Sequence, residues 1–291
     1  MNQPLQVNLT KELLELENFI IHRSCDIEQW FRSQWLENQA PFYGSVDLRN
    51  SGFKLAPVDM NLFPGGFNNL NPDFAPLAIQ AASVAIEKVC PEAKKVLIIP
   101  EKHTRNMFYL KNLFQFKEIL KNSGLEVRIG SVDTSILEST NIDIDENHFI
   151  TIEPIEKRED FLFLKNKDGS EFIPCSIILN NDLSGGVPEK IKNVGQQIIP
   201  PINAGWPTRR KSSHFQFYSQ VAKEFSLLTN SDPWLIDPLS EKLDNLNFSA
   251  GEGEDRLVET IDRLLHQIQK KYNEYNISQD PYVVIKANAG T

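Results

Sequence analysis

The sequence predicts an α/β fold in which helices flank a mixed or largely parallel sheet. Residues 95–100 (KVLIIP) form a continuous apolar run, which is typical of a strand buried on both faces. A helical pattern runs from about Asn106 to Lys121, Gly124 ends it, and Leu125 to Ile129 forms another strand. A strand, a helix and a strand in this order indicate a parallel unit, whose binding sites lie beyond the carboxyl ends of the strands.

Three helices are predicted before the first of these strands. The first has apolar residues at positions 13, 14, 16 and 20, and the second begins near Ser24 or Asp26. The third begins at residues 71–73 (NPD), where a capping asparagine, a first-turn proline and a first-turn acid coincide, and it ends near Cys90. The face of this third helix that we expect to be buried consists of Phe74, Leu77, Ala78, Ala81, Val84, Ala85 and Val89.

The second half of the chain alternates strands and helices less regularly. Residues 166–169 (NKDG) indicate a hairpin, and Ser176 to Leu179 is a further buried strand. A helix is expected after Lys211, and a last helix after residues 251–253. Tyr282 to Ile285 has the composition of a strand, and Lys286 follows it.

The stretch from Asp47 to Asn69 concentrates charges and amides beside prolines and glycines. Alternation of apolar and polar residues from Phe53 to Met60 predicts a strand, and residues 64–66 (PGG) predict a loop. We interpret the stretch as a polar pocket; the alternative is a solvated edge strand with its turn. The candidate binding residues here are Asp47, Arg49, Lys54, Asp59, Asn61 and Asn68.

Polar residues at three other places extend this pocket. Asn180 follows a buried strand, at the start of the segment NNDLSGG. Arg209, Arg210 and Lys211 stand at a predicted helix entrance, where they form either an anion site or a solvated basic turn. Lys286 and Gly290 offer a cation and a glycine loop, as in several nucleotide sites. His103 is a secondary candidate beyond the first buried strand.

Bulk composition limits the possible functions. A net charge of −9 over 291 residues argues against a general nucleic-acid or acidic-membrane surface. The three cysteines have no metal-binding spacing, which favours a reducing, cytoplasmic setting. The first residues do not have the pattern of a signal peptide, and no apolar run is long enough to span a bilayer. The sequence does not indicate an oligomeric state.

Three segments together resemble one family. They are DLRNSGFKLAPVDMNLFPGGFNNL from Asp47, PPINAGWPTRRKSSHF from Pro200, and VIKANAGT from Val284. They are similar to the proteobacterial glutamate–cysteine ligase family of the ATP-grasp type. The resemblance implies a substrate-binding α/β region over residues 1–230 and the start of an ATP-grasp domain over residues 231–291. It also implies that relatives continue further, so that this chain is a fragment or a truncated product.

The resemblance implies a reaction and a set of partners. ATP phosphorylates the γ-carboxylate of glutamate, and the amine of cysteine then displaces phosphate from γ-glutamyl phosphate. Arg49, Arg209 and Arg210 would hold carboxylate or acyl phosphate, and Asp47 or Asp59 an ammonium group. Lys286 would contact the ATP phosphates, and Mg²⁺ would be held by residues beyond this chain. The alternatives are a non-catalytic amino-acid-binding module and an interaction protein.

Overall fold

The computed structural model describes residues 11–102 and 106–289, which form two compact units. The larger unit comprises residues 21–49 and 57–209, and the smaller comprises residues up to 20, 50–56 and those from 210 onward. The chain therefore passes between the units four times. The expected division at residue 230 concerned an ATP-grasp domain and remains a prediction.

A six-stranded mixed sheet forms the centre of the larger unit, with strand order β11-β10-β3-β4-β6-β5. All neighbouring strands run parallel except β5, which is antiparallel to β6 at the edge. The mixed α/β architecture expected from the sequence is confirmed. The strands are β3 (Lys95–Pro100), β4 (Glu126–Ser131), β5 (Thr140–Asp143), β6 (Phe149–Pro154), β10 (Ser176–Asn180) and β11 (Gln197–Ile199).

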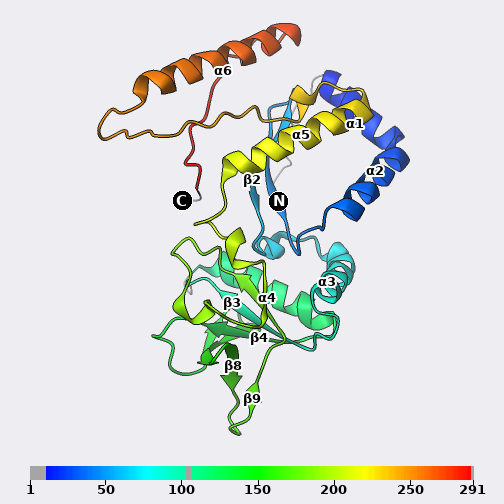
Figure 1. Ribbon diagram of the computed structural model, residues 1–291. Helices are drawn as coiled ribbons and strands as arrows, with labels where there is room; N and C mark the ends of the chain where they lie inside the picture. The colour runs from blue at the N-terminus through cyan, green and yellow to red at the C-terminus, as the bar shows by residue number, and fades with distance from the viewer. Residues whose placement is uncertain (1–10, 103–105, 290–291) are drawn as a thin grey trace. The chain divides into compact units, whose positions relative to one another are not determined.

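Each face of this sheet has its own core, because the strand residues alternate between faces. Val96 and Ile98 of β3 pack with α4 (Met107–Asn122) and Ile86 of α3 (Ala75–Val89). Leu97 and Ile99 pack instead with the small antiparallel sheet β7-β8-β9 and with the segment after β10. Figure 1 shows α4 beside β3 and β4. The small sheet consists of β7 (Glu156–Arg158), β8 (Phe161–Lys165) and β9 (Glu171–Phe172).

The direction of the connections reverses at β3. The chain moves from β3 through α4 to β4 on one side, and later from β10, on the other side of β3, to β11. Parallel crossovers are almost always right-handed, so connections that advance in opposite directions cover opposite faces. The two cores show this arrangement. The carboxyl ends of β3 and β10 therefore meet at a topological switch point, the usual position of ligands in open α/β sheets.

The buried face of α3 differs from the prediction. Phe74, Leu77 and Val84 are 54%, 61% and 45% exposed, whereas Ile86 is buried and Ala82 and Val89 pack beside it. The helix has apolar residues on most of its surface, so periodicity alone does not identify the face that meets α4. The cap is confirmed: the Asn71 side chain accepts a hydrogen bond from the N–H of Asp73, in the turn η2 (Pro72–Phe74) that leads into α3.

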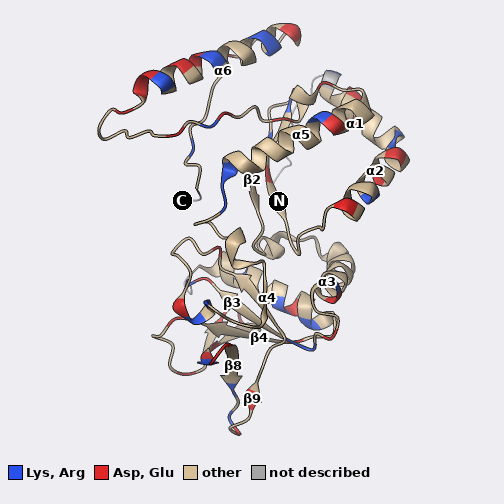
Figure 2. Cartoon of the chain, in the orientation of Figure 1, with Lys and Arg blue, Asp and Glu red and all other residues tan. Residues whose placement is uncertain are grey.

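The smaller unit is built around aromatic side chains. Phe53 stacks on Trp234, Trp234 stacks on Tyr275, and Tyr272 meets Phe53 edge-on. Leu13 and Leu16 complete this core. Its helices are α5 (Lys211–Thr229) and α6 (Glu254–Glu274), with η5 (Pro233–Leu235) between them; α1 (Lys11–His22) begins in this unit and α2 (Ser24–Glu37) follows it in the larger one. Acidic and basic residues both occur along the length of α6 (Figure 2).

The strand predictions for two further segments, residues 45–61 and residues 282–285, have different outcomes. Strands β1 (Ser45–Asn50) and β2 (Leu55–Asn61) form a two-stranded sheet, of which the sequence predicted the second strand. Residues 282–285, predicted as a strand, have no strand pairing in the structure. Their composition favours a strand, but a strand also requires a partner for its backbone hydrogen bonds. In the described part of the chain, no helix is long and apolar enough to cross a bilayer.

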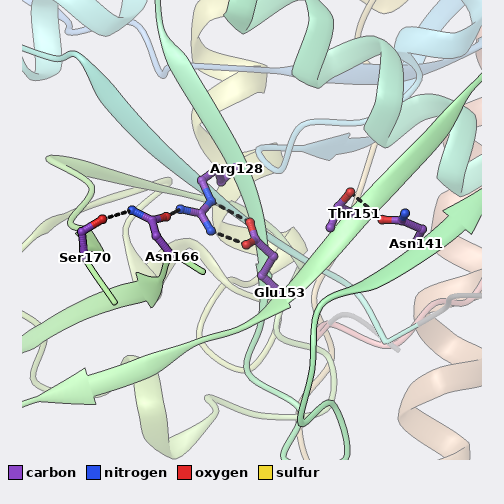
Figure 3. A network of polar contacts seen from close by, with 6 residues as sticks. All are labelled: Arg128, Asn141, Thr151, Glu153, Asn166 and Ser170. Carbon is purple, nitrogen blue, oxygen red and sulfur yellow. Dashed lines mark hydrogen bonds and ion pairs between the residues drawn. The ribbon is translucent and has the colours of Figure 1, made fainter. Parts of the chain in front are cut away.

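A polar network fixes the small sheet to the main sheet. Arg128 of β4 forms a two-pronged ion pair with Glu153 of β6, with a distance of 2.7 Å from Nε to Oε2. Arg128 also donates to Oδ1 of Asn166, whose Nδ2 donates to Ser170 in the β8–β9 turn (Figure 3). The guanidinium group lies 4.9 Å from the ring centroid of Phe172. Because Arg128 and Glu153 are both mostly buried, the pair is poorly screened by water.

We predict that Glu153→Gln destabilises the larger unit by about 3 kcal/mol, because it leaves the Arg128 charge buried without its counter-ion. Urea unfolding measures the loss. Glu171→Gln is the matched control, since Glu171 pairs with Arg158 at 2.9 Å in an exposed position. That control should cost much less than Glu153→Gln, because water screens an exposed ion pair. Equal losses in the two variants would contradict the structural role assigned to Arg128.

Candidate functional site

The candidate site lies where β3 and β10 end. Asn180 is paired with Pro100 in the register of these two strands, so the residues that follow them are neighbours. The carboxylate of Glu101, after β3, accepts a hydrogen bond of 3.0 Å from the N–H of Asp182, after β10. Asn181 donates to the carbonyl of Pro100 at 3.5 Å. Two carboxylates and two amides are therefore held together at the switch point.

The hydroxyl group of Tyr109 links the ends of the two strands through hydrogen bonds. Its hydroxyl accepts a 2.7 Å hydrogen bond from the N–H of Glu101 and donates a 3.2 Å hydrogen bond to the carbonyl of Asn180. Burial raises the pKa of Tyr109 well above its usual value, and the nearby carboxylates of Glu101 and Asp182 raise it further. The hydroxyl therefore keeps its proton and stays a donor to Asn180.

Asn180 connects this site with the glycine loop after β2. Its Nδ2 donates to the carbonyl of Pro64, and its Oδ1 is buried without a hydrogen-bond partner among the described residues. The hydroxyl of Tyr43 donates to the carbonyl of Gly65, and Gly66 has φ of 76°, a value that favours glycine. The loop is thus fixed through its carbonyl groups. Asn180 is a predicted candidate, and its Oδ1 can accept a hydrogen bond from a ligand.

Arg209 and Asp59 form the charged part of the site. Their closest atoms are 3.8 Å apart and both side chains are mostly buried. Burial lowers the pKa of Arg209, and Asp59 opposes that shift. The N–H of Trp206 donates to the carbonyl of Asp182 at 3.1 Å, which ties the segment before Arg209 to the end of β10. Gly205 is required beside Leu183, because a Cβ there would lie 2.9 Å from Leu183 Cδ1.

The other predicted residues of the larger unit have different positions. Asn61 Oδ1 accepts a hydrogen bond of 3.0 Å from the N–H of Phe63, so it shapes the approach to the loop. Asn68 donates to Asn69 at 3.2 Å. Asp47 and Arg49 are exposed on β1, and the contacts described above do not include them. Their roles in binding remain predictions.

Lys54, Arg210 and Lys286 belong to the smaller unit. Lys54 Nζ lies 4.6 Å from the ring centroid of Trp234. Burial lowers the pKa of Lys54 to about 8, against the opposing effect of Asp237 and Asp232. Arg210 and Lys286 are exposed, and Arg210 directly precedes α5. Gly290 and His103 lie outside the described residues.

Several residues of the site were missed by sequence reasoning. Tyr109 is part of a helical pattern, so nothing in the sequence separates it from core residues. Glu101 and Asp182 lie in segments that were noted as loops beyond strand ends, but neither was selected. The register between β3 and β10 would have identified both, and that register depends on a long-range pairing.

The described residues do not contain a group of three His, Cys, Asp or Glu side chains placed to hold a metal ion. At the switch point there are two such side chains, Glu101 and Asp182, and a group of three is the minimum. No metal is therefore assigned to the candidate site.

The chain is similar to a known protein family and to a solved structure. The family model described as glutamate-cysteine ligase (GshA) matches residues 17–291. A crystal structure from Methylobacillus flagellatus KT, of a protein provisionally named gamma-glutamylcysteine synthetase, is 52% identical with a TM-score of 0.89. The match covers 96% of this chain and 65% of that protein. No curated protein sequence matches the chain.

We predict that Tyr109→Phe destabilises the larger unit by about 1–2 kcal/mol, because the N–H of Glu101 and the carbonyl of Asn180 both lose their shared partner. Urea unfolding monitored by circular dichroism measures the change. Tyr43→Phe removes one hydrogen bond of the glycine loop and is the comparison variant. A Tyr109→Phe protein as stable as the wild type would show that the hydroxyl does not join the strand ends.

Lys54 gives a pH-dependent prediction. Its pKa in the folded protein, about 8, lies below its ordinary value of 10.5, so between these values the unfolded chain binds more protons. The Lys54 contribution therefore lowers stability below about pH 8, and this cost disappears as the pH rises toward 10.5. Lys54→Met should be more stable than the wild type at pH 7 by about 1 kcal/mol, with the difference decreasing at pH 10. Thermal unfolding at both pH values measures it; an unchanged difference contradicts the shift.

Proposed function

The chain belongs to the glutamate–cysteine ligase family, and on that premise we propose that it takes part in forming γ-glutamylcysteine from glutamate and cysteine with ATP. The chain spans 65% of the length of the related protein from Methylobacillus flagellatus KT, so the reaction of the whole protein is part of the proposal. The product is the first intermediate of glutathione synthesis. Unpaired cysteines, at positions 25, 90 and 175, favour a cytoplasmic setting.

One observation supports the proposal beyond family membership. The positively charged Arg209 and the negatively charged Asp59 lie close together in the larger unit, which also contains the glycine loop at residues 64–66. Arg209 would bind a carboxylate of glutamate, since a guanidinium group matches two carboxylate oxygens. Glu101 or Asp182 would attract the α-ammonium group, and Asn180 Oδ1 supplies an uncharged acceptor. Asp59 would orient the guanidinium group of Arg209. At 3.8 Å the pair is long, so the guanidinium N–H groups could still bind a substrate carboxylate.

The chemistry requires activation of a carboxylate and attack by an amine. ATP supplies the phosphoryl group, which leaves as phosphate after the γ-glutamyl phosphate reacts with the amine of cysteine. The residues of this chain bind and orient: Arg209 would reduce repulsion between the γ-carboxylate and the triphosphate. Lys286 and Arg210 would contribute charge on the phosphate side. We also propose that the region from residue 231 onward has ATP-grasp character and that the reaction uses Mg²⁺.

An amino-acid-binding module without catalysis is the second candidate. It is favoured by the position of Glu101, Asn180 and Arg209 within one compact unit. Calorimetry of the 291-residue chain with glutamate and with ATP separates the two candidates. Binding of both ligands, with release of ADP that depends on glutamate and cysteine, supports the ligase. Glutamate binding without ADP release supports the module, and binding of neither contradicts both.

We predict that Arg209→Ala weakens glutamate binding at least tenfold, because a charge-assisted pair with the substrate carboxylate is lost. Arg209→Lys should recover part of the affinity, since it keeps the charge but not the two-pronged geometry. Arg158→Ala, in an exposed ion pair of the same unit, is the control and should bind as the wild type does. Wild-type affinity in Arg209→Ala would exclude this arginine from the site.

A further inference from the structure

The first turn of α5 is capped by a residue from the end of the chain. Asn288 accepts two hydrogen bonds there, each of 2.9 Å: its carbonyl oxygen from the N–H of Lys211 and its Oδ1 from the N–H of Ser212. These residues belong to the same compact unit although 76 positions separate Ser212 from Asn288. The N-terminal N–H groups of a helix lack partners within the helix, so the cap satisfies two of them.

This cap changes the interpretation of the basic segment at residues 209–211. The sequence suggested that the helix entrance itself could bind an anion through backbone N–H groups and the cations beside them. Two of those N–H groups already donate to Asn288. A phosphate near this end of α5 would therefore be bound mainly by side chains. The basic side chains around the cap are the groups that could bind it.

The same cap limits how far the backbone of Lys286 can lie from the start of α5. Two residues of extended chain span at most about 7 Å, so the backbone of Lys286 lies within that distance of Asn288. Asn288 is itself bound to Lys211, the neighbour of Arg210. The lysine predicted to meet ATP phosphates is thus held beside the basic start of α5 by one asparagine, although residues 282–287 have no strand pairing of their own.

We propose that Asn288 is a positioning residue: by binding the first turn of α5 it holds Lys286 near Arg210, so that both cations act on one polyphosphate. The inference rests on the proposed function, because it takes the phosphate side of the ligase site to be formed by these cations. Asn288 does not itself meet the phosphates in this arrangement. It reduces the conformational freedom that Lys286 would otherwise lose on binding.

Calorimetry with inorganic triphosphate tests the proposal on the 291-residue chain. Asn288→Ala should weaken triphosphate binding about five- to tenfold, and Lys286→Ala should weaken it by a similar factor. Because Asn288 acts through Lys286, Asn288→Ala should have little further effect in a Lys286→Ala background. Asn71→Ala is the matched control, since Asn71 caps another helical segment by the same kind of hydrogen bond; it should bind triphosphate as the wild type does.

Hydrogen exchange at the N–H groups of Lys211 and Ser212 reports on the cap itself. Asn288→Ala should increase exchange at both, whereas Asn288→Asp, which keeps the acceptor oxygen, should retain protection. Wild-type triphosphate affinity in Asn288→Ala, or an undiminished effect in the Lys286→Ala background, would overturn the proposal and leave the ligase function standing. If the wild-type chain binds no triphosphate, both the role of Asn288 and the proposed phosphate binding by Lys286 and Arg210 are overturned.

Discussion

The parallel pairing of β3 with β10 is the constraint on which the candidate site depends. This pairing places Asn180 beside Pro100, and the contacts of Glu101 with Asp182 and of Asn181 with Pro100 follow from that register. The two strands are 80 residues apart in sequence at these positions, and both are buried on two faces. Their position is therefore set by the two hydrophobic cores, which hold the polar residues beyond them in place. The side chains of Val96 to Ile99 and of Ile177 to Leu179 are almost fully buried, and such a frame favours a well-defined site geometry.

Local signals predicted much of the fold. Continuous apolar runs identified β3 and β10, and an asparagine cap identified the turn that leads into α3, because a cap or a buried run depends on neighbouring residues alone. The failures have a common cause. The buried face of α3 and the absence of pairing at residues 282–285 are both determined by distant partners. An almost uniformly apolar helix and a short β-rich segment do not specify those partners.

The candidate site was predictable by region but only partly by residue. Loops after β3 and β10 were recognised, and Asn180, Asp59 and Arg209 were selected because their side chains carry obvious chemistry. Tyr109 was not, because its role depends on which backbone groups its hydroxyl reaches. Arg209 and Arg210 are adjacent in sequence, yet the boundary between the two compact units falls between them. Their roles are accordingly different in our proposal.

The behaviour of Lys54 explains why the substrate carboxylate is assigned to arginine. Both Lys54 and Arg209 are partly buried, and burial lowers the pKa of each. For Lys54 the result is a pKa of about 8, so part of its charge is lost slightly above neutral pH. The pKa of an arginine starts so high that a shift from partial burial leaves the guanidinium charged. In a protein with a net charge of −9, retention of the proposed anionic substrates requires cations that keep their charge when water is excluded. Arg209 satisfies that requirement, and Lys54 is better suited to packing against Trp234.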